Sequence, residues 1–282
     1  MRVLATFLLL AGLSGAAAAQ APAPIPSPAA ALAPAEAEAL KKSCDKGNAA
    51  DCLTLAPHDP AKSAGLYKKA CDGGQARGCY ELAGMHLAGQ GASKDVKTAI
   101  VLFQRSCDLK DAEACIRLAT VFSEGKDVEK DLGRASTLLS ASCDGGNARA
   151  CARLGAMHRD GTGLAADPKS AVQLFQKACD GGDAEGCSET GVAYRLGRGV
   201  ARDPLKATAL FTKSCDAGSM AACYNLGLAF ESGTGAPRDL AKAIALYTRA
   251  CDGHDAGGCH GLGLAYHNGL GEPKDVVRAA AL

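Results

Sequence analysis

The sequence has little of the features that mark several large protein classes. It contains no tryptophan and only 6 phenylalanine and 6 tyrosine residues in 282 positions, and alanine inflates its 48% hydrophobic content, which favours helices over membrane spans. Its 31 basic and 30 acidic residues leave a formal net charge of +1, without the basic excess that nucleic-acid binding requires. We therefore expect neither a nucleic-acid partner nor a membrane span in the mature chain.

The one long apolar run lies at the beginning of the chain. Arg2, an apolar core over 3–13 and small residues at 17–19 have the pattern of a cleavable secretory signal over residues 1–20. The run is shorter than the about 20 residues that a spanning helix needs. Prolines recur among alanines over 21–34, which is typical of an extended linker. We expect export to the periplasm or the exterior, with a repeat domain over 35–282.

All 14 cysteines belong to a nine-residue frame that recurs along the chain. Each frame begins and ends with cysteine, and an aspartate follows the first cysteine every time. The pairs are Cys44 with Cys52, Cys71 with Cys79, Cys107 with Cys115, Cys143 with Cys151, Cys179 with Cys187, Cys215 with Cys223 and Cys251 with Cys259. From Cys71 onward the frames recur every 36 residues, and a unit of this length buries its apolar face only against its neighbours.

Each unit has two apolar stripes with helical spacing. Cys79, Leu82, Ala83 and His86 stand at i, i+3, i+4 and i+7, and a second stripe from Val96 to Cys107 has the same spacing. Such stripes predict amphipathic helices. The sequence therefore predicts an all-α structure, an α/α solenoid of about seven helical hairpins.

The expected helix boundaries also recur with the repeat. The first helix of each unit should be capped four residues after the opening cysteine, by Asn48, Gln75, Asp111, Asn147, Asp183, Ser219 and Asp255, six of which are preferred N-caps. It should end at Gly89, Gly125, Gly161, Gly197, Gly233 and Gly269, because glycine tolerates the left-handed terminal position. The second helix should begin at Asp59, Asp95, Asp131, Asp167, Asp203, Asp239 and Asp275, with Pro60, Pro168 and Pro204 in its first position.

The cysteine spacing favours disulfides over metal binding or redox catalysis. Two cysteines eight positions apart on one straight helix would be about 12 Å apart, beyond disulfide range, so the turn between them must reverse the chain. Zinc ligands are usually closer in sequence, no close Cys-x-x-Cys pair is present, and each pair has an aspartate rather than a basic neighbour to activate a thiol. An even cysteine count after a signal segment favours one disulfide per repeat, with no cofactor.

The repeats resemble a known family. The run from Ala222 to Phe230, the loop Gly233-Thr234-Gly235 and the helix end Arg249-Ala250-Cys251 are similar to the Sel-one-like repeat, and in particular to its cysteine-rich Hcp subclass in bacteria. The resemblance covers nearly everything after residue 35. It implies a scaffold that holds other proteins in a concave groove and, for the Hcp subclass, penicillin binding and slow β-lactam hydrolysis as an alternative.

The sequence offers little chemistry for a β-lactamase. Ser43 and Lys46 fit the spacing S-x-x-K, but the accompanying S-D-N and K-T-G elements do not occur. His260 and His267 are seven positions apart, too far to share a metal easily. We assign no catalytic and no metal-binding residue.

Recognition should instead use side chains of the first helices that vary between units. Four arginines stand off the apolar face and could form an electropositive strip for an acidic peptide or polysaccharide, with two tyrosines adding contact area. These residues are Arg117, Arg153, Arg159, Arg195, Tyr80 and Tyr224. A solvated helix face is the alternative for each of them. The expected partner is a protein or peptide, with cell-wall material or a β-lactam as the other possibilities.

Overall fold

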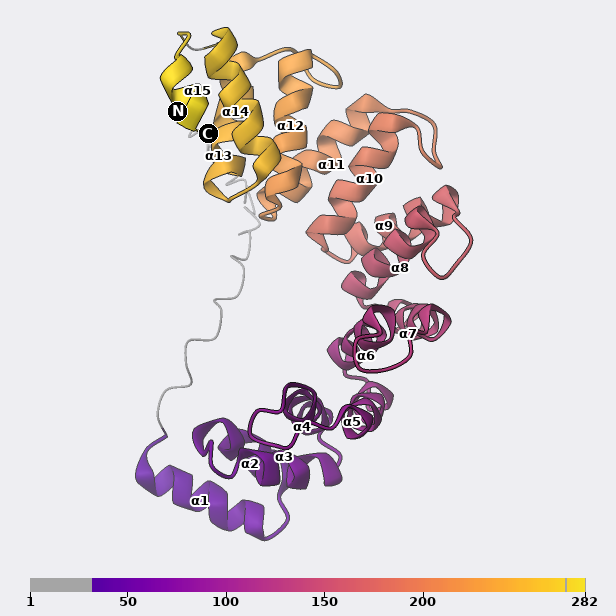
Figure 1. Cartoon of the computed structure of the whole chain (residues 1–282), viewed down its shortest axis with the longest axis vertical. Coiled ribbons are helices and arrows are strands. Elements are labelled where there is room, and N and C mark those ends of the chain that lie inside the picture. The colour runs from indigo at the N-terminus through magenta and orange to yellow at the C-terminus, as the bar shows by residue number, and fades with distance from the viewer. Residues whose placement is uncertain (1–31, 272, 282) are drawn as a thin grey trace, which may run out of the picture.

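The computed structural model describes residues 32–271 and 273–281, so the predicted signal segment and most of the predicted linker lie outside the described residues. The described chain folds into helices joined by turns and loops. Successive hairpins follow an arc from α1 to α15 (Figure 1). The prediction of an all-α solenoid is confirmed. Within these ranges, no helix has the length and apolar content needed to cross a membrane.

Each repeat contains a first and a second helix. The first helices are α2 (Ala49–Leu55), α4 (Ala76–Ala88), α6 (Ala112–Glu124), α8 (Ala148–Asp160), α10 (Ala184–Leu196), α12 (Met220–Ser232) and α14 (Ala256–Asn268). The second helices are α3 (Ser63–Asp72), α5 (Val96–Asp108), α7 (Leu132–Asp144), α9 (Pro168–Asp180), α11 (Pro204–Asp216), α13 (Leu240–Asp252) and α15 (Val276–Ala281). The helix α1 (Pro34–Asp45) precedes them, and the 3-10 helix η1 (Ala56–His58) extends α2.

The first helices form the inner layer of the arc. The helices α8 and α10 contact each other directly, as do α12 and α14, whereas the described second helices have no comparable contact with one another. A stack bends toward the layer whose members are closer together, so the concave side is lined by the first helices. We call these the inner helices and the second helices the outer helices.

Most of the predicted helix boundaries are confirmed. All seven expected capping residues are N-caps of inner helices, and six of them accept a backbone amide with their side chain; Gln75 does not. All six expected terminal glycines are left-handed, with φ between 65° and 71°. Aspartates 95, 131, 167, 203, 239 and 275 accept amides from the first turn of their outer helices.

The expected start of the first outer helix is wrong. Asp59 does not cap α3, because its amide closes the turn of η1 onto Ala56 and its carbonyl accepts the amide of Lys62. Both groups belong to a tight turn, so the helix begins later, at Ser63, and Pro60 lies outside it. At the N-terminal boundary, Pro34 is the first residue of α1 rather than the last residue of the linker.

The cysteine frame forms the turn between one outer helix and the next inner helix. In every frame the two cysteines are joined, with Cα atoms 4.4–4.8 Å apart. In the frame that begins at Cys179, Gly182 is left-handed with φ of 89°, and the amide of Asp183 donates to the carbonyl of Ala178 at 2.9 Å. The chain therefore reverses within the frame, and the disulfide connects the last turn of one helix to the first turn of the next.

Small residues on the inner helices allow the outer helices to approach closely. Phe103, Phe211 and Tyr247 are 1% exposed, and each comes from an outer helix. A Cβ atom added to Gly191 would lie 2.7 Å from the ring of Phe211. The high alanine and glycine content therefore reflects tight inner-to-outer packing around a few aromatic rings.

Candidate binding groove

Three cavities recur at equivalent positions along the inner helices. Each is enclosed by the end of one inner helix, the outer helix of the same repeat and the inner helix of the next repeat. Cavity A, about 150 Å³, lies between α4, α5 and α6. Cavity B, about 250 Å³, lies between α8, α9 and α10, and cavity C, about 240 Å³, lies between α10, α11 and α12. Together they form a row along the groove. Each is enclosed by the end of an inner helix from a different repeat, α4, α8 or α10.

Cavity C combines an apolar floor with a cationic rim. Phe211 and Leu228 belong to the floor, and Thr234 adds a hydroxyl. Arg195, at the end of α10, and Arg202, in the loop before α11, are the charged lining residues. The Nε atom of Arg195 is buried without a hydrogen-bond partner, while the Nε atom of Arg202 donates to the carbonyl of Arg195 at 3.2 Å.

Cavity B contains a similar arginine that is already neutralised. The guanidinium of Arg159 binds both carboxylate oxygens of Asp160, at 2.8 and 2.9 Å, and lies 2.7 Å from a carboxylate oxygen of Glu189. The hydrogen bond to Asp160 raises the pKa of this guanidinium further, and Glu189 adds to the effect. Because Arg159 serves two carboxylates of its own chain, it has little capacity left for an acidic ligand.

The remaining two arginines of the predicted strip lie near cavity A. Arg117 lines it directly and is exposed. Arg153 is half-buried and donates from Nη1 to the hydroxyl of Thr120 at 2.7 Å, and Thr120 lines the same cavity. The structure therefore places all four predicted arginines along the inner helices, although they differ in how far their charge is available.

The two predicted tyrosines are held within the packing of the array. The ring of Tyr80 meets that of Phe103 edge to face at 5.6 Å, and burial raises the pKa of its hydroxyl. The ring of Tyr224 lies 5.8 Å from that of Tyr247. Both tyrosines follow the closing cysteine by one position, and each ring packs against a ring from the outer helix of its own repeat. They offer less contact area than the sequence suggested.

Two residues of the groove were not among the sequence candidates. Arg198 lines cavity B and Arg202 lines cavity C. Both lie in the glycine-containing loop between α10 and α11. A local excess of positive charge could have identified both residues, because the run from Arg195 to Arg202 holds three arginines and no acidic residue.

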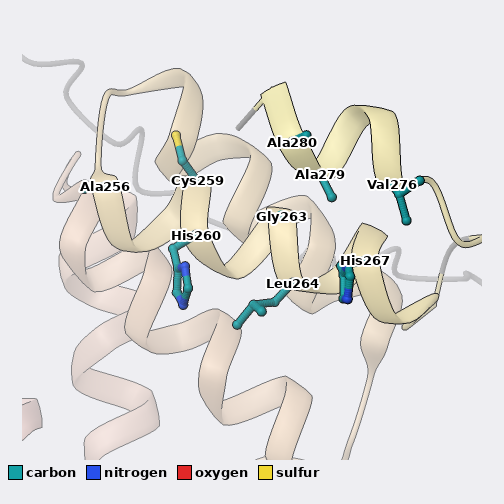
Figure 2. Close-up of a pocket in the computed structure, with 9 residues that line it drawn as sticks. All are labelled: Ala256, Cys259, His260, Gly263, Leu264, His267, Val276, Ala279 and Ala280. Carbon is teal, nitrogen blue, oxygen red and sulfur yellow. The ribbon is translucent and has the colours of Figure 1, made fainter.

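A larger open cavity lies at the C-terminal end of the array. It measures about 550 Å³ and is bounded by α14 and α15. Figure 2 shows His260 and His267 on α14, apart from each other on either side of Leu264, with Val276 and Ala279 on α15. Within residues 32–271 and 273–281, no group of three or more His, Cys, Asp or Glu side chains could hold a metal ion.

Two of the serines that precede the opening cysteines connect the helices of one repeat. The hydroxyl of Ser106 donates to the carbonyl of Ala76 at 2.7 Å, and that of Ser214 donates to the carbonyl of Ala184 at 2.6 Å. Each ties the end of an outer helix to the start of the inner helix of its own repeat. Ser43 lies in the last turn of α1, where its carbonyl accepts the amide of Lys46, so this spacing reflects a helix end.

Comparison with known proteins places these repeats in a family. The model of the Sel1 repeat matches residues 54–75, 76–111, 112–147, 148–183, 184–219, 221–255 and 256–282. A search of curated proteins finds no match.

Solved structures with the same fold come from several bacteria. A protective antigen of uropathogenic Escherichia coli with an SLR fold has a TM-score of 0.71 at 22% identity, covering 87% of this chain and 62% of its own. A Sel1 repeat protein from Oxalobacter formigenes has a TM-score of 0.72 at 20% identity, covering 83% and 94%. The chain thus spans less than two thirds of the length of the E. coli antigen.

A cysteine-rich relative also matches. Cysteine-rich protein B of Helicobacter pylori is 23% identical over 59% of this chain and 93% of its own, with a TM-score of 0.23. That score supports no argument about the arrangement of the repeats. The resemblance recognised in the sequence is confirmed at the level of the repeat by the matching family model.

Proposed function

The chain belongs to the Sel1 repeat family, and from this premise we propose that it is an exported scaffold that holds a protein or peptide partner in its concave groove. The observation that carries the proposal is the row of cavities A, B and C along the inner helices. Each is smaller than the about 300–1,000 Å³ of a small-molecule site. Cavities of this size on a periodic surface suit successive side chains of an extended segment.

The disulfides support the proposal of export. All cysteines of the chain are paired, with none free in the described residues. Disulfides persist in the periplasm and outside the cell, whereas the cytosol keeps thiols reduced. A solenoid with a disulfide at each turn from one outer helix to the next inner helix is suited to an oxidising compartment.

Enzymatic β-lactam hydrolysis is not part of the proposal. No hydrogen bond joins the side chains of Ser43 and Lys46 in the described part of the chain, and the equivalent serines Ser106 and Ser214 donate to backbone carbonyls. A serine hydrolase needs its nucleophile beside a base. We therefore propose that the protein acts by binding alone.

Site-specific photo-cross-linking in intact cells tests the scaffold proposal. A photoreactive amino acid is placed at Arg117 or Asn225 on inner helices, and at Val101 or Gln173 on outer helices as matched controls. Val101 is 67% exposed and Gln173 is exposed, so both outer positions are accessible to solvent. The expected result is a discrete cross-linked product from the inner positions and little from the outer ones.

Each variant is first checked for helical circular dichroism and for complete oxidation. Equal or stronger cross-linking from Val101 and Gln173 would mean that the partner uses the convex side. That result would refute the concave groove as the binding surface.

A further inference from the structure

Cavity C differs from the other two cavities in the charge of its lining. Its lining residues include two arginines, three hydroxyl side chains and no carboxylate. Cavity A contains Glu124 and Asp127 beside its basic residues, and cavity B contains Glu189. The cationic character of cavity C is therefore not compensated within its own lining.

The carboxylates that directly adjoin lining residues of cavity C along the chain, Asp203 and Glu231, are engaged elsewhere. Asp203 directly follows Arg202, but its side chain accepts the amide of Lys206 at 3.1 Å and caps α11. Glu231 accepts a hydrogen bond from the hydroxyl of Tyr247. Neither Arg195 nor Arg202 forms an ion pair within the described residues, in contrast to Arg159 in cavity B.

The floor of the same cavity is apolar. Ala207 is 2% exposed, Phe211 1% and Ala229 7%, and Leu228 is half-buried beside them. The hydroxyls of Thr208 and Ser232 already donate to carbonyls within their own helices. Apart from the hydroxyl of Thr234, the polar capacity of the cavity is therefore on the arginine side, and the wall formed by Phe211 and Leu228 can take a hydrocarbon side chain.

A ligand that fits this arrangement carries an anionic group next to an apolar one. Guanidinium groups bind carboxylates through paired, charge-assisted hydrogen bonds, and an apolar wall of this size accepts one side chain. A nucleic acid would place phosphates along the whole groove, where Glu189, Glu124 and Asp127 would repel them. The nearly balanced charge of the chain also argues against a nucleic-acid ligand.

We propose that cavity C anchors a partner segment through an acidic residue at Arg195 and Arg202 and an adjacent apolar residue on the floor formed by Phe211 and Leu228. This inference rests on the proposed function, because it names the chemistry that the concave groove selects. It assigns recognition to the α10–α11 loop as well as to the inner helices.

The chain offers a matched control for Arg202. Arg238 is its equivalent one repeat later, and its Nε atom donates to the carbonyl of Glu231 at 3.0 Å, as that of Arg202 donates to the carbonyl of Arg195. Arg238 does not line cavity C. Arg202→Gln and Arg238→Gln therefore remove the same charge and the same backbone contact, and only the first alters the cavity.

The test uses the full oxidised chain and three short fluorescein-labelled peptides. One alternates glutamate with leucine, the second replaces glutamate with glutamine, and the third replaces leucine with serine. Binding is followed by fluorescence anisotropy at low and at physiological salt. We expect the glutamate–leucine peptide to bind at least about tenfold more tightly than either analogue, since a charge-assisted contact and an apolar contact are each lost.

The variants give the decisive comparison. Arg202→Gln and Arg195→Gln should each weaken binding of the glutamate–leucine peptide about tenfold or more, and Arg238→Gln should leave it within about twofold. Circular dichroism and thiol counting verify that all three variants are folded and oxidised. Equal losses in Arg202→Gln and Arg238→Gln would refute the site, because a general electrostatic attraction would then suffice.

Failure of the inference is distinguishable from failure of the proposed function. If the glutamine analogue binds as well as the acidic peptide, or if no peptide binds, the acidic–apolar anchor is wrong. Cross-linking from Arg117 and Asn225 would still support a groove with another preference. If cross-linking occurs only from the outer helices, the groove itself is not the binding surface.

Discussion

Reduction of the disulfides is predicted to unfold the protein under conditions where the oxidised protein is fully helical. Each bridge joins cysteines eight positions apart. The chain-entropy relation assigns a loop of this length about 2.5 kcal/mol. Over the seven bridges, this gives about 18 kcal/mol, whereas a typical native domain is stable by only about 5–15 kcal/mol.

The lost disulfide contribution is expected to unfold the protein because the helices are too short to be stable alone. Most inner and outer helices have 13 residues, and isolated helices shorter than about 12–15 residues are marginal in water. A reduced repeat must therefore rely on packing against its neighbours alone. We expect the loss of constraint to exceed the stability that this packing provides.

The assay is far-ultraviolet circular dichroism before and after treatment with a phosphine reductant in non-denaturing buffer. Alkylation and intact-mass measurement verify that all 14 cysteines have been reduced. The expected result is loss of most of the helical signal and of the cooperative melting transition. A fully reduced sample that keeps both would refute the reasoning, because the repeats would then be stable through packing alone.

Removing one bridge at a time provides the control. The double substitution Cys179→Ala with Cys187→Ala breaks a central frame, and Cys251→Ala with Cys259→Ala breaks a terminal one. Each repeat contacts only its neighbours, so the central variant should melt in two separable steps and the terminal variant should fray at one end. Both should retain most of their helical signal at room temperature.

Three further predictions concern single positions. Lys110 is left-handed with φ of 71° at a frame position that glycine occupies in most repeats; Lys110→Gly should raise the free energy of unfolding by about 1 kcal/mol in denaturant titration, and a decrease would contradict the assigned strain. The pKa of Asp95 is lowered, chiefly by the hydroxyl of Thr98 and then by backbone amides, so its stabilising contribution is present above the unfolded pKa of about 3.9 and is lost as the pH falls through the folded value. Asp95→Asn keeps a capping side chain without a titrating group, and its melting temperature should fall less on acidification than that of the unaltered protein; an equal fall would exclude Asp95 as a contributor. Purified oxidised protein should show no nitrocefin hydrolysis that depends on Ser43, and a steady rate abolished by Ser43→Ala would contradict a purely binding role.

The repeat and most of its helix boundaries follow from the sequence. Capping residues such as Asn147 and terminal glycines such as Gly161 act on the backbone within one helical turn, so their effect is the same wherever the unit stands in the array. The pairing of the cysteines follows likewise, because an eight-residue separation can be bridged only across a reversal of the chain. The exception is Asp59, which lies in a shorter connection. Its backbone amide and carbonyl are hydrogen-bonded in two consecutive turns, so it does not begin a helix as the equivalent aspartates do.

The binding surface depends on contacts between repeats, which the pattern of residues within one repeat does not encode. Arg159 and Arg195 occupy equivalent positions 36 residues apart, but only Arg159 meets a carboxylate on the inner helix of the next repeat, at Glu189. Tyr80 and Tyr224 were predicted as contact residues, and each ring packs against a ring of the outer helix in its own repeat and is only partly exposed.

The sequence by itself therefore determined that the chain forms helical hairpins with a disulfide at each cysteine frame, since these features arise within about 36 residues of one another. Only the tertiary structure decided which arginines remain available, because availability depends on the side chains that an adjacent repeat places against them. The same stacking brings Arg202, a loop residue, to the rim of cavity C beside Arg195.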